Sequence, residues 1–246
     1  AEDALHLIKV DYEHLPVIGD PEKALEPDAR PIHGDTNLLK HVEWSVGDAE
    51  EGFRECDLVL EDSFETHVVQ HMPMETHTYA AEHDRHSGRL TVWTSTQGVH
   101  NIRILLGKIL DMPLTRIRVI KPFTGGSFGG KNDLFDEIVV ALMAMETGRP
   151  VRLTLTRWEE FVGTRTRHAN RFYLKLGFKL DGTLHARTLR AYLNAGGYSA
   201  ASPKVTMTTG HRWMMLYRTP HVRYEGFAVY TNFPVAGAFR GFGTPQ

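Results

Sequence analysis

The stretch Thr115-Arg-Ile-Arg-Val-Ile-Lys-Pro-Phe-Thr-Gly-Gly-Ser-Phe-Gly-Gly-Lys131 decides the fold expected for this chain of 246 residues. Its first half carries the β-branched residues Val119 and Ile120 and predicts a strand. Its second half places four glycines within residues 125–130, where they permit close approaches and unusual backbone angles. Apolar residues then recur at helical spacing over residues 134–145. The stretch therefore predicts a strand, a glycine-rich loop and a helix.

This order of elements favours an anion bound over the loop. Backbone N–H groups and the positive end of the following helix would both face such a group, and a phosphate is the simplest example. The alternative is a tight turn without a ligand. Four glycines in six residues cost backbone entropy on folding that a mere connection does not require, so binding is favoured.

The composition excludes several classes of function. With 28 basic residues against 30 acidic ones, the formal charge of −2 offers no footprint for nucleic acid or an anionic membrane. Cys56 is the only cysteine, so this chain alone holds no disulfide, cysteine-based zinc site or iron–sulfur cluster, and a reducing, cytoplasmic location is expected. No run approaches the ~18 apolar residues of a membrane span. Because the chain opens on Ala1 rather than methionine, a fragment is expected.

Hydrophobic patterns along the chain predict an α+β fold in which mixed β-sheets pack against helices. Helices are expected at residues 1–7 (a last turn), 48–53 and 99–110. Strands are expected over residues 7–10, 58–60, 64–69, 89–96, 151–156, 172–178, 184–193 and 224–231, with a tight turn at 181–182. Residues 26–47 are rich in proline and glycine and predict an extended linker, which places a domain boundary near residue 45.

Residues 125–131 nearly match the P-loop pattern G-x-x-x-x-G-K. Lys131 is placed to reach a phosphate, but Asn132 replaces the Ser or Thr that holds Mg²⁺ in that motif. No G-x-G-x-x-G dinucleotide fingerprint occurs. A P-loop-like phosphohydrolase is therefore a minor alternative.

Two arginine-bearing segments suit a ligand but are ambiguous by themselves. Residues 164–168 (Thr-Arg-Thr-Arg-His) fit a carboxylate, a phosphate or a polar heterocycle, although such a cluster is more often a solvated strand edge. Arg240 lies between Phe239 and Phe242 among glycines, as in many ligand pockets. Neither segment identifies its ligand.

A metal site is weighed at His71-Met-Pro-Met-Glu-Thr-His77. Two histidines flank Glu75, but their spacing fits no helical metal motif, and Pro73 breaks any helix there. These residues are therefore expected to have structural roles, or to support other residues that contact a ligand.

Read together, five motifs resemble the xanthine dehydrogenase/aldehyde oxidase family in order and approximate spacing. The family's molybdenum-cofactor subunit is matched from the tail of its small N-terminal domain to about the middle of its cofactor-binding region. The five motifs are Met74-Glu-Thr-His77, Ser95-Thr-Gln97, Gly125-Gly-Ser-Phe-Gly-Gly-Lys131, Arg165-Thr-Arg-His168 and Ala238-Phe-Arg-Gly-Phe-Gly-Thr-Pro-Gln246.

The resemblance implies a molybdopterin cofactor, in its simple form or as the cytosine dinucleotide, whose molybdenum is held by the pterin and not directly by the protein. Gln97 would hydrogen-bond an oxygen ligand of the molybdenum. Gly126, Phe128 and Gly129 would place backbone amides near the cofactor, and Arg240 would lie close to the metal centre. These roles agree with the anion-binding loop predicted from the residues alone.

Substrate positions are carried over in the same way. Arg167 falls where purine-oxidising members of the family keep an arginine that orients the heterocycle, and Phe242 where they keep an aromatic ring that packs against it. Asn132 departs from the Glu or Gln of purine oxidases, and its shorter reach puts xanthine itself in doubt. The last motif resembles purine or N-heterocycle hydroxylases more than the A-Y-R-C of carbon monoxide dehydrogenases or the A-Y-R-G-A-G-R-P-E of aldehyde-oxidising members.

The family mechanism implied is attack by a molybdenum-bound hydroxyl on an electrophilic carbon, with a glutamate base near the family's C-terminus. The leading hypothesis is a partial molybdenum-binding subunit, inactive alone, of an enzyme that hydroxylates xanthine or a related small heterocycle. Its partners would be the C-terminal half of the subunit and the chains or domains that carry [2Fe–2S] clusters and FAD.

The resemblance also divides the chain. Residues 1–45 would be the tail of a small, hammerhead-like N-terminal domain plus a linker, and residues 46–246 would be a first molybdopterin-binding domain, incomplete at its C-terminus. The alternatives are a cofactor-free fragment or scaffold half that needs a C-terminal partner, an aldehyde-oxidising member of the family, and the P-loop-like phosphohydrolase.

Overall fold

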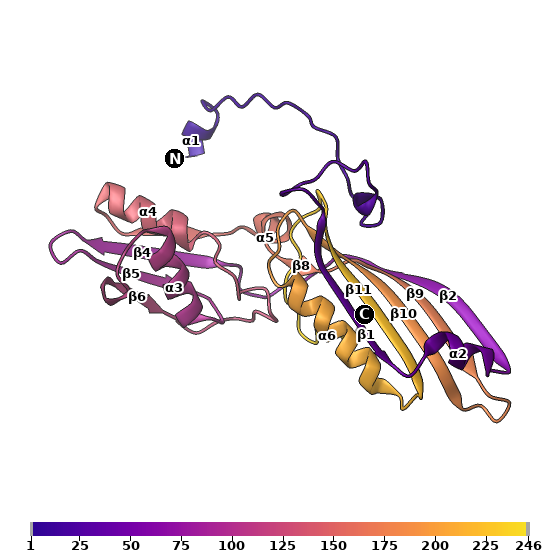
Figure 1. Cartoon of the computed structure of the whole chain (residues 1–246). Coiled ribbons are helices and arrows are strands. Elements are labelled where there is room, and N and C mark those ends of the chain that lie inside the picture. Colours follow the sequence, from indigo (N-terminus) through magenta and orange to yellow (C-terminus); the bar gives the residue numbers. More distant parts are fainter. Residues whose placement is uncertain (1, 245–246) are drawn as a thin grey trace.

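Two mixed β-sheets with helices packed against them make up the body of the protein (Figure 1). The computed structural model describes residues 2–244. Each sheet contains one pair of parallel neighbours, and each of these pairs is connected by a helix. Such crossovers are expected, because a tight turn cannot join parallel strands. The α+β class predicted from the sequence is confirmed.

The smaller sheet has the strand order β6-β5-β4-β7. Helices α3 and α4 both pack on one face, where Leu90, Ile102 and Val140 are fully buried. Its elements are β4 (Thr78–Asp84), β5 (Arg89–Thr94), α3 (Val99–Ile109), β6 (Ile117–Ile120), α4 (Glu137–Thr147) and β7 (Val151–Thr154). The glycine loop connects β6 to α4, so this sheet fixes both ends of the loop.

The larger sheet has five strands in the order β1-β11-β10-β9-β2. Helix α6 crosses one face and buries Leu193, Val205 and Tyr224 beneath it. The strands and this helix are β1 (Leu38–Val46), β2 (Leu58–Thr66), β9 (Asn170–Phe178), β10 (Leu184–Gly196), α6 (Ser202–Leu216) and β11 (His221–Tyr230).

Short elements complete the chain. They are α1 (Glu2–Leu5), α2 (Ala49–Arg54), β3 (Val69–Gln70), α5 (Arg157–Gly163), β8 (Thr166–Arg167) and two 3₁₀ turns (Lys23–Leu25 and Leu114–Arg116). Strands β3 and β8 pair with each other and bring residues 71–77 close to residues 164–168. Among residues 2–244, no helix has the length and apolar character needed to cross a bilayer.

Most predicted elements are present, but some were misplaced and others were missed. The hairpin of β9 and β10, helix α3 and the short helix capped by the Asp48 carboxylate are confirmed. The strand predicted at 7–10 is wrong, because those residues form no strand. The linker predicted over 26–47 is wrong beyond residue 37, because β1 pairs with β11 along its length. That strand spans the boundary predicted near residue 45.

Helix α6 was not predicted, because threonines and a glycine hide its helical pattern. Thr206, Thr208 and Thr209 donate their hydroxyl hydrogen bonds to the carbonyl four residues back, which satisfies them inside the helix. A Cβ on Gly210 would lie 2.4 Å from the ring of Tyr224, so only glycine allows this close packing on the sheet. Strand β4 and helix α5 were not predicted either.

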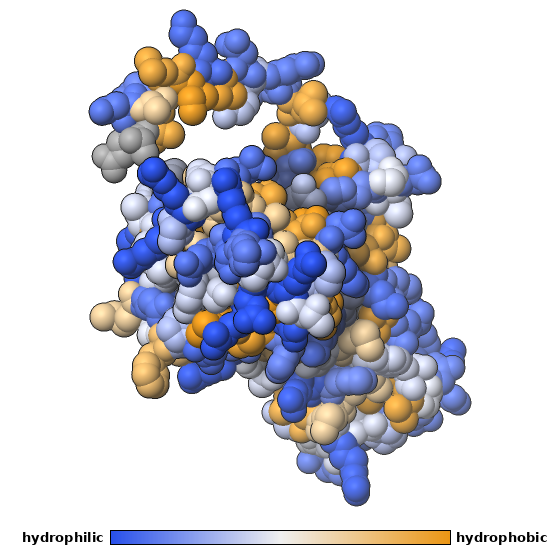
Figure 2. Space-filling view, turned by 90° about the vertical axis from the view of Figure 1, so that its left-hand side faces the viewer, coloured by the Kyte–Doolittle hydropathy of each residue, from blue (hydrophilic) through white to orange (hydrophobic). Residues whose placement is uncertain are grey.

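The N-terminal segment leaves its apolar side chains on the surface. Residues 2–17 arch away from the two sheets (Figure 2), and Leu7, Tyr12 and Val17 are each more than three-quarters exposed. Further along, the buried Asn37 donates to the carbonyls of Ala24 and Arg30, which holds residues 24–37 together. The backbone N–H of Tyr230 donates to the carbonyl of Asn37 and attaches this segment to β11. Ala1, Pro245 and Gln246 lie outside the described residues, so the end of the last motif has no structural description.

Candidate cofactor-binding site

The glycine loop presents three backbone donors that the protein itself does not use. Gly126 has φ +100° and Phe128 has φ +50°, positive backbone angles of the kind found in turns that bind anions. Within residues 2–244, the N–H groups of Gly126, Ser127 and Phe128 meet no hydrogen-bond acceptor. None of these three residues is buried. The loop therefore offers a small array of donors suited to an anion or to metal-bound oxygen.

Gly129 is required by the fit of this loop against the C-terminal segment. Its φ is +104°, and a Cβ at this position would lie 2.5 Å from the carbonyl oxygen of Ala238. Gly129 also donates its N–H to Oε1 of Gln97 at 3.0 Å. Only glycine accommodates both the backbone angle and the close approach.

Gln97 connects the loop to the end of strand β5. Its backbone N–H donates to the carbonyl of Lys131 at 2.8 Å, and its exposed side chain accepts from Gly129. Because Oε1 faces the loop, the amide NH₂ is the part of the side chain left to donate to a ligand. This orientation fits the predicted hydrogen bond to an oxygen atom.

Arg240 is brought to the same loop from the other end of the chain. Its backbone N–H donates to the carbonyl of Phe128 at 2.7 Å, and its side chain is exposed. Gln97, Gly129, Phe128 and Arg240 thus form one hydrogen-bonded chain that joins three distant segments. The structure brings together all the residues predicted to contact the cofactor.

Arg167 is committed to the Arg240 loop. Its Nη2 donates to the carbonyl of Arg240 at 2.9 Å, and its guanidinium lies 4.1 Å from the ring centre of Phe239. The ring of His71 also stacks on Phe239, with the two ring centres 4.2 Å apart. His71 also hydrogen-bonds the carbonyl of Ala238 at 2.9 Å. The predicted arginine-bearing segment is therefore partly buried support for the loop rather than a solvated edge.

The side chains of the other two predicted substrate residues do not take part in these contacts, although the backbone N–H of Phe242 donates to the carbonyl of Phe239. Phe242 packs against the core beneath α6, with the Lys204 ammonium 6.0 Å from its ring centre. Asn132 is half-buried directly after Lys131, and its side chain has no hydrogen-bond partner within residues 2–244. Their roles toward a substrate stay predictions.

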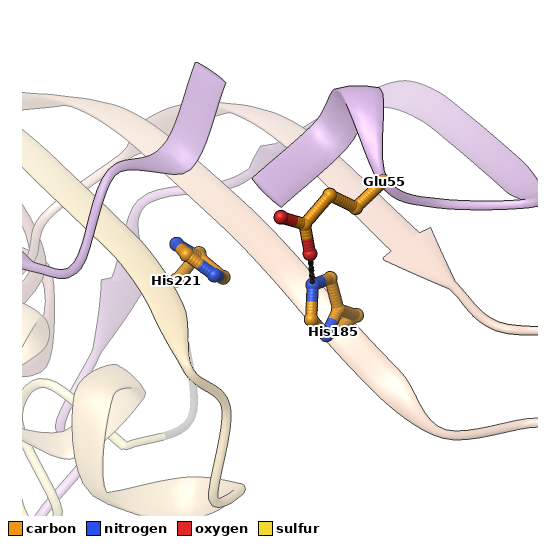
Figure 3. Close-up of side chains that lie close together, drawn as sticks. All are labelled: Glu55, His185 and His221. Carbon is orange, nitrogen blue, oxygen red and sulfur yellow. Dashed lines mark hydrogen bonds and ion pairs between the residues drawn. The ribbon is translucent and has the colours of Figure 1, made fainter. Parts of the chain in front are cut away.

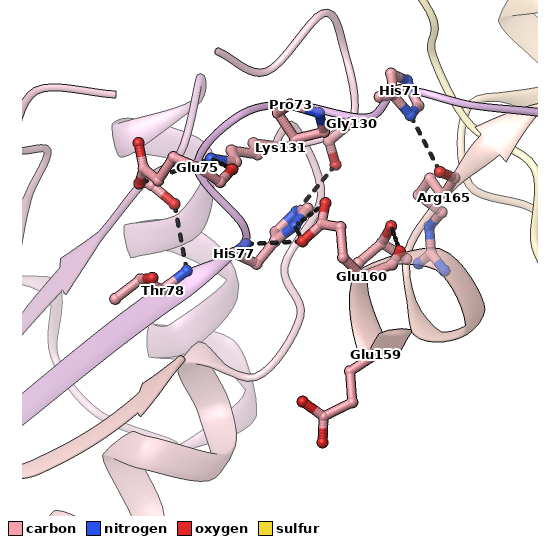
Figure 4. Close-up of polar contacts among 12 residues, drawn as sticks. His71, Pro73, Glu75, His77, Thr78, Gly130, Lys131, Glu159, Glu160 and Arg165 are labelled. Atoms are coloured by element: carbon pink, nitrogen blue, oxygen red, sulfur yellow. Dashed lines mark hydrogen bonds and ion pairs between the residues drawn. The ribbon is translucent and has the colours of Figure 1, made fainter. Parts of the chain in front are cut away.

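Lys131 does not face the space over the loop. It is 1% exposed, its Nζ donates to the backbone carbonyl of Glu75 at 2.9 Å, and it lies 3.6 Å from the Glu75 carboxylate (Figure 4). Burial lowers the pKa of Lys131, and the Glu75 charge opposes that shift. The P-loop expectation that this lysine reaches a phosphate is wrong, because its side chain points into the protein.

The contribution expected from a helix N-terminus is also wrong. Helix α4 begins at Glu137, six residues after Lys131 and not directly after the loop. Glu137 is 1% exposed and accepts from the Thr94 hydroxyl and from the backbone N–H of Phe135. The protein's own carboxylate therefore occupies the first turn of this helix, and backbone amides alone form the donor array.

A buried histidine–glutamate pair supports the loop from below. His77 and Glu160 are 3% and 1% exposed, and the His77 ring and backbone N–H both meet the Glu160 carboxylate within 2.9 Å (Figure 4). Burial opposes ionisation of Glu160, but these hydrogen bonds outweigh it and hold its pKa below the usual range. The other ring nitrogen of His77 lies 3.3 Å from the carbonyl of Gly130. The structural role expected for these histidines agrees with this geometry, and Glu160 was not predicted.

A second polar cluster lies at the far end of the larger sheet. Ligand-type atoms of Glu55, His185 and His221 come within 4.8 Å of one another (Figure 3). However, Nδ1 of His221 already accepts from the backbone N–H of Asp48, and the Lys179 ammonium lies 3.9 Å from the same Glu55 oxygen that bonds His185. An ion-pair network accounts for these contacts, and a cation would have to displace them.

The glycine loop and the loop around Arg240 meet at a surface whose exposed donors suit an anionic ligand. Residues 32–246 match the molybdopterin cofactor-binding domain family, and the chain belongs to that family. The assignment made from the five motifs is thereby confirmed.

Three known proteins show how this chain relates to the family. It is 39% identical to the xanthine dehydrogenase molybdenum-binding subunit of Escherichia coli O157:H7 and 38% identical to the nicotinate dehydrogenase large molybdopterin subunit of Eubacterium barkeri. These alignments cover the whole chain but only 33% and 57% of the two relatives. The aldehyde oxidoreductase structure from Desulfovibrio gigas superposes with a TM-score of 0.94 at 29% identity, over 100% of this chain and 27% of that one. The chain thus spans about a third of the xanthine relative.

The donor set fits a molybdopterin cofactor. Three adjacent amides without internal acceptors, an amide NH₂ at Gln97 and an exposed guanidinium at Arg240 all donate hydrogen bonds. Phosphate and metal-bound oxygen are acceptors, so the chemistry is complementary. Of two hollows on the larger sheet, of about 470 and 380 Å³, neither is lined by a residue of the glycine loop. The site is an open surface made by loops.

Proposed function

We propose that this chain is part of the molybdenum-binding subunit of a hydroxylase that oxidises xanthine or a related N-heterocycle with oxygen from water. The observation that carries this proposal is the meeting of Gln97, Gly129, Phe128 and Arg240 in one chain of hydrogen bonds. Residues 97, 128 and 240 are far apart in the sequence. Segments so distant are expected to meet only where they form a shared core or a shared ligand site. Here the side chains of Gln97 and Arg240 are exposed, which favours a ligand.

Each of these residues has a defined task in the proposed site. The amide NH₂ of Gln97 would donate to an oxygen ligand of the molybdenum, and the amides of residues 126–128 would hold acceptor oxygens of the cofactor. The guanidinium of Arg240 adds a fixed positive charge close to developing negative charge. When bound, the molybdenum cofactor supplies the oxygen transfer and accepts two electrons. The protein residues would orient it and stabilise charge.

The N-heterocycle is proposed as substrate on two grounds. The xanthine and nicotinate relatives carry names of N-heterocycle dehydrogenases, and the motif around Arg240 resembles the hydroxylases of such rings. Arg167, Phe242 and Asn132 are the residues proposed to contact the ring. The contacts of Arg167 support a second task, because it fixes the carbonyl of Arg240.

The remaining partners are proposed from length and composition. Because the chain spans 33% of the xanthine relative, further parts of a full-length subunit would complete the cofactor site. With Cys56 as its only cysteine, it leaves [2Fe–2S] clusters and FAD to other chains or domains, in a reducing cytoplasm. The proposed cofactor is molybdopterin, in its simple form or as the cytosine dinucleotide.

Substrate tests on the assembled enzyme distinguish the candidates. We expect xanthine, hypoxanthine or nicotinate to be oxidised faster than benzaldehyde, with heavy oxygen entering the product from isotopically enriched water. Faster oxidation of benzaldehyde would replace the heterocycle by the aldehyde alternative, which the structural similarity to an aldehyde oxidoreductase keeps open. Molybdenum analysis of the same preparation should give about one atom per assembly. An assembly that is active on none of these substrates and contains no molybdenum would leave the scaffold alternative.

A further inference from the structure

Glu75 connects the two ends of the glycine loop. At one end, its backbone N–H donates to the carbonyl of Gly125 at 3.2 Å, and its carboxylate accepts from the N–H of Gly125. At the other end, its backbone carbonyl accepts from Nζ of Lys131 at 2.9 Å. Figure 4 shows Glu75 and Lys131 side by side above the His77–Glu160 pair. Glu75 therefore contacts both Gly125 and Lys131, the first and last residues of the loop.

Glu75 is itself held in place from outside the loop. The guanidinium of Arg157, at the start of α5, donates to the carbonyls of Pro73 and Met74 at 2.7 and 2.9 Å. A Cβ on Gly125 would lie 2.8 Å from Cβ of Glu75, so the two backbones are in close contact. The support under the loop is therefore rigid.

The contact with Gly125 helps to decide which amides of the loop are used within the protein. Because the Gly125 N–H is used by Glu75 and the Gly129 N–H by Gln97, the amides between them remain as donors. If the carboxylate were lost, Gly125 could rotate, and the direction of the three following N–H groups would no longer be fixed.

We propose that Glu75 is a positioning residue, which orients the amides of Gly126, Ser127 and Phe128 for an oxyanion by accepting a hydrogen bond from Gly125. The inference rests on the proposed function only for the identity of that oxyanion. A simple structural ion pair with Lys131 would use the same side chain, but through its charge and not through its acceptor oxygen.

Two substitutions separate these roles. Glu75→Gln removes the charge but keeps an oxygen that can accept from Gly125, whereas Glu75→Ala removes both. Inorganic phosphate is titrated into the full chain while the amide resonances of residues 126–128 are followed by NMR. We expect phosphate to shift these resonances, with affinity reduced at least tenfold in the Ala variant and less than threefold in the Gln variant. The exposed Glu82→Gln on β4 is the control and should match the wild type.

Each other outcome overturns the inference. Equal losses in the Ala and Gln variants would mean that Glu75 acts through its charge, and no loss in either would mean that it does not position the loop. If phosphate leaves the three amides unshifted in the wild type, the oxyanion array itself is refuted. Hydrogen exchange of the Gly125 amide provides a second measurement, since without any ligand it should be faster in the Ala variant, which lacks the acceptor, than in the Gln variant. Failure of the hydroxylase assay would instead concern the proposed function alone.

Discussion

Replacing Gly129 by alanine tests how tightly the glycine loop packs against residues 238–240, the segment that carries Arg240. The backbone angle of φ +104° is unfavourable for any L-residue and costs about 1–2 kcal/mol. The new Cβ would also lie 2.5 Å from the Ala238 oxygen and 2.9 Å from its carbonyl carbon, both of them backbone atoms. Relief of such an overlap costs roughly a further 1–3 kcal/mol. We therefore expect Gly129→Ala to lower the free energy of unfolding by about 2–5 kcal/mol.

A second glycine provides the matched control. Gly182 has φ +85° in the turn between β9 and β10, and a Cβ there would meet nothing within 4 Å. Gly182→Ala should therefore show the backbone penalty alone, about 1–2 kcal/mol. Both variants are measured by urea unfolding with circular dichroism, and the difference between them isolates the contact with Ala238. If Gly129→Ala were no less stable than Gly182→Ala, the close packing of the two loops would be refuted.

Three further predictions address buried charges and the loop around Arg240. Burial lowers the pKa of His168 from 6.5 to about 4, so the unfolded chain binds a proton at a higher pH than the folded protein. The free energy of unfolding should therefore fall by up to ~1.4 kcal/mol per pH unit as the pH drops from 6.5 to 4. In His168→Asn, the urea midpoint should depend less on pH between pH 7 and 4. Glu160→Gln should lower the unfolding free energy by about 3–5 kcal/mol because it breaks a buried pair, whereas exposed Glu146→Gln should change it by less than about 0.5. Arg167→Met should reduce purine turnover of the assembled enzyme more than tenfold, and unchanged kinetics would exclude Arg167 from the site.

Local sequence patterns predicted the elements that carry their own signal. The alternation over residues 172–178 and 184–193, with Asp181-Gly182 between them, predicted the β9–β10 hairpin because both strands and the turn are encoded within a short segment. The same holds for α3, whose apolar residues recur at helical spacing. Helix α6 was not predicted, because Gly210 and its buried threonines have low helix propensity. These residues instead pack against the sheet, and a propensity scale does not include such tertiary contacts.

The sequence by itself determined the residues that form the proposed site and the family to which they belong. Gln97, Phe128, Gly129 and Arg240 were all identified from motifs, because their types and spacing are local properties. Only the tertiary structure decided what Lys131 and Glu75 do. A lysine after a glycine loop can point toward a ligand or into the protein, and the outcome depends on whether a carboxylate and a carbonyl from a distant segment are there to satisfy its charge. Here Glu75 provides both, so the lysine is buried beneath the loop and the backbone amides of residues 126–128 are the donors left to the proposed ligand.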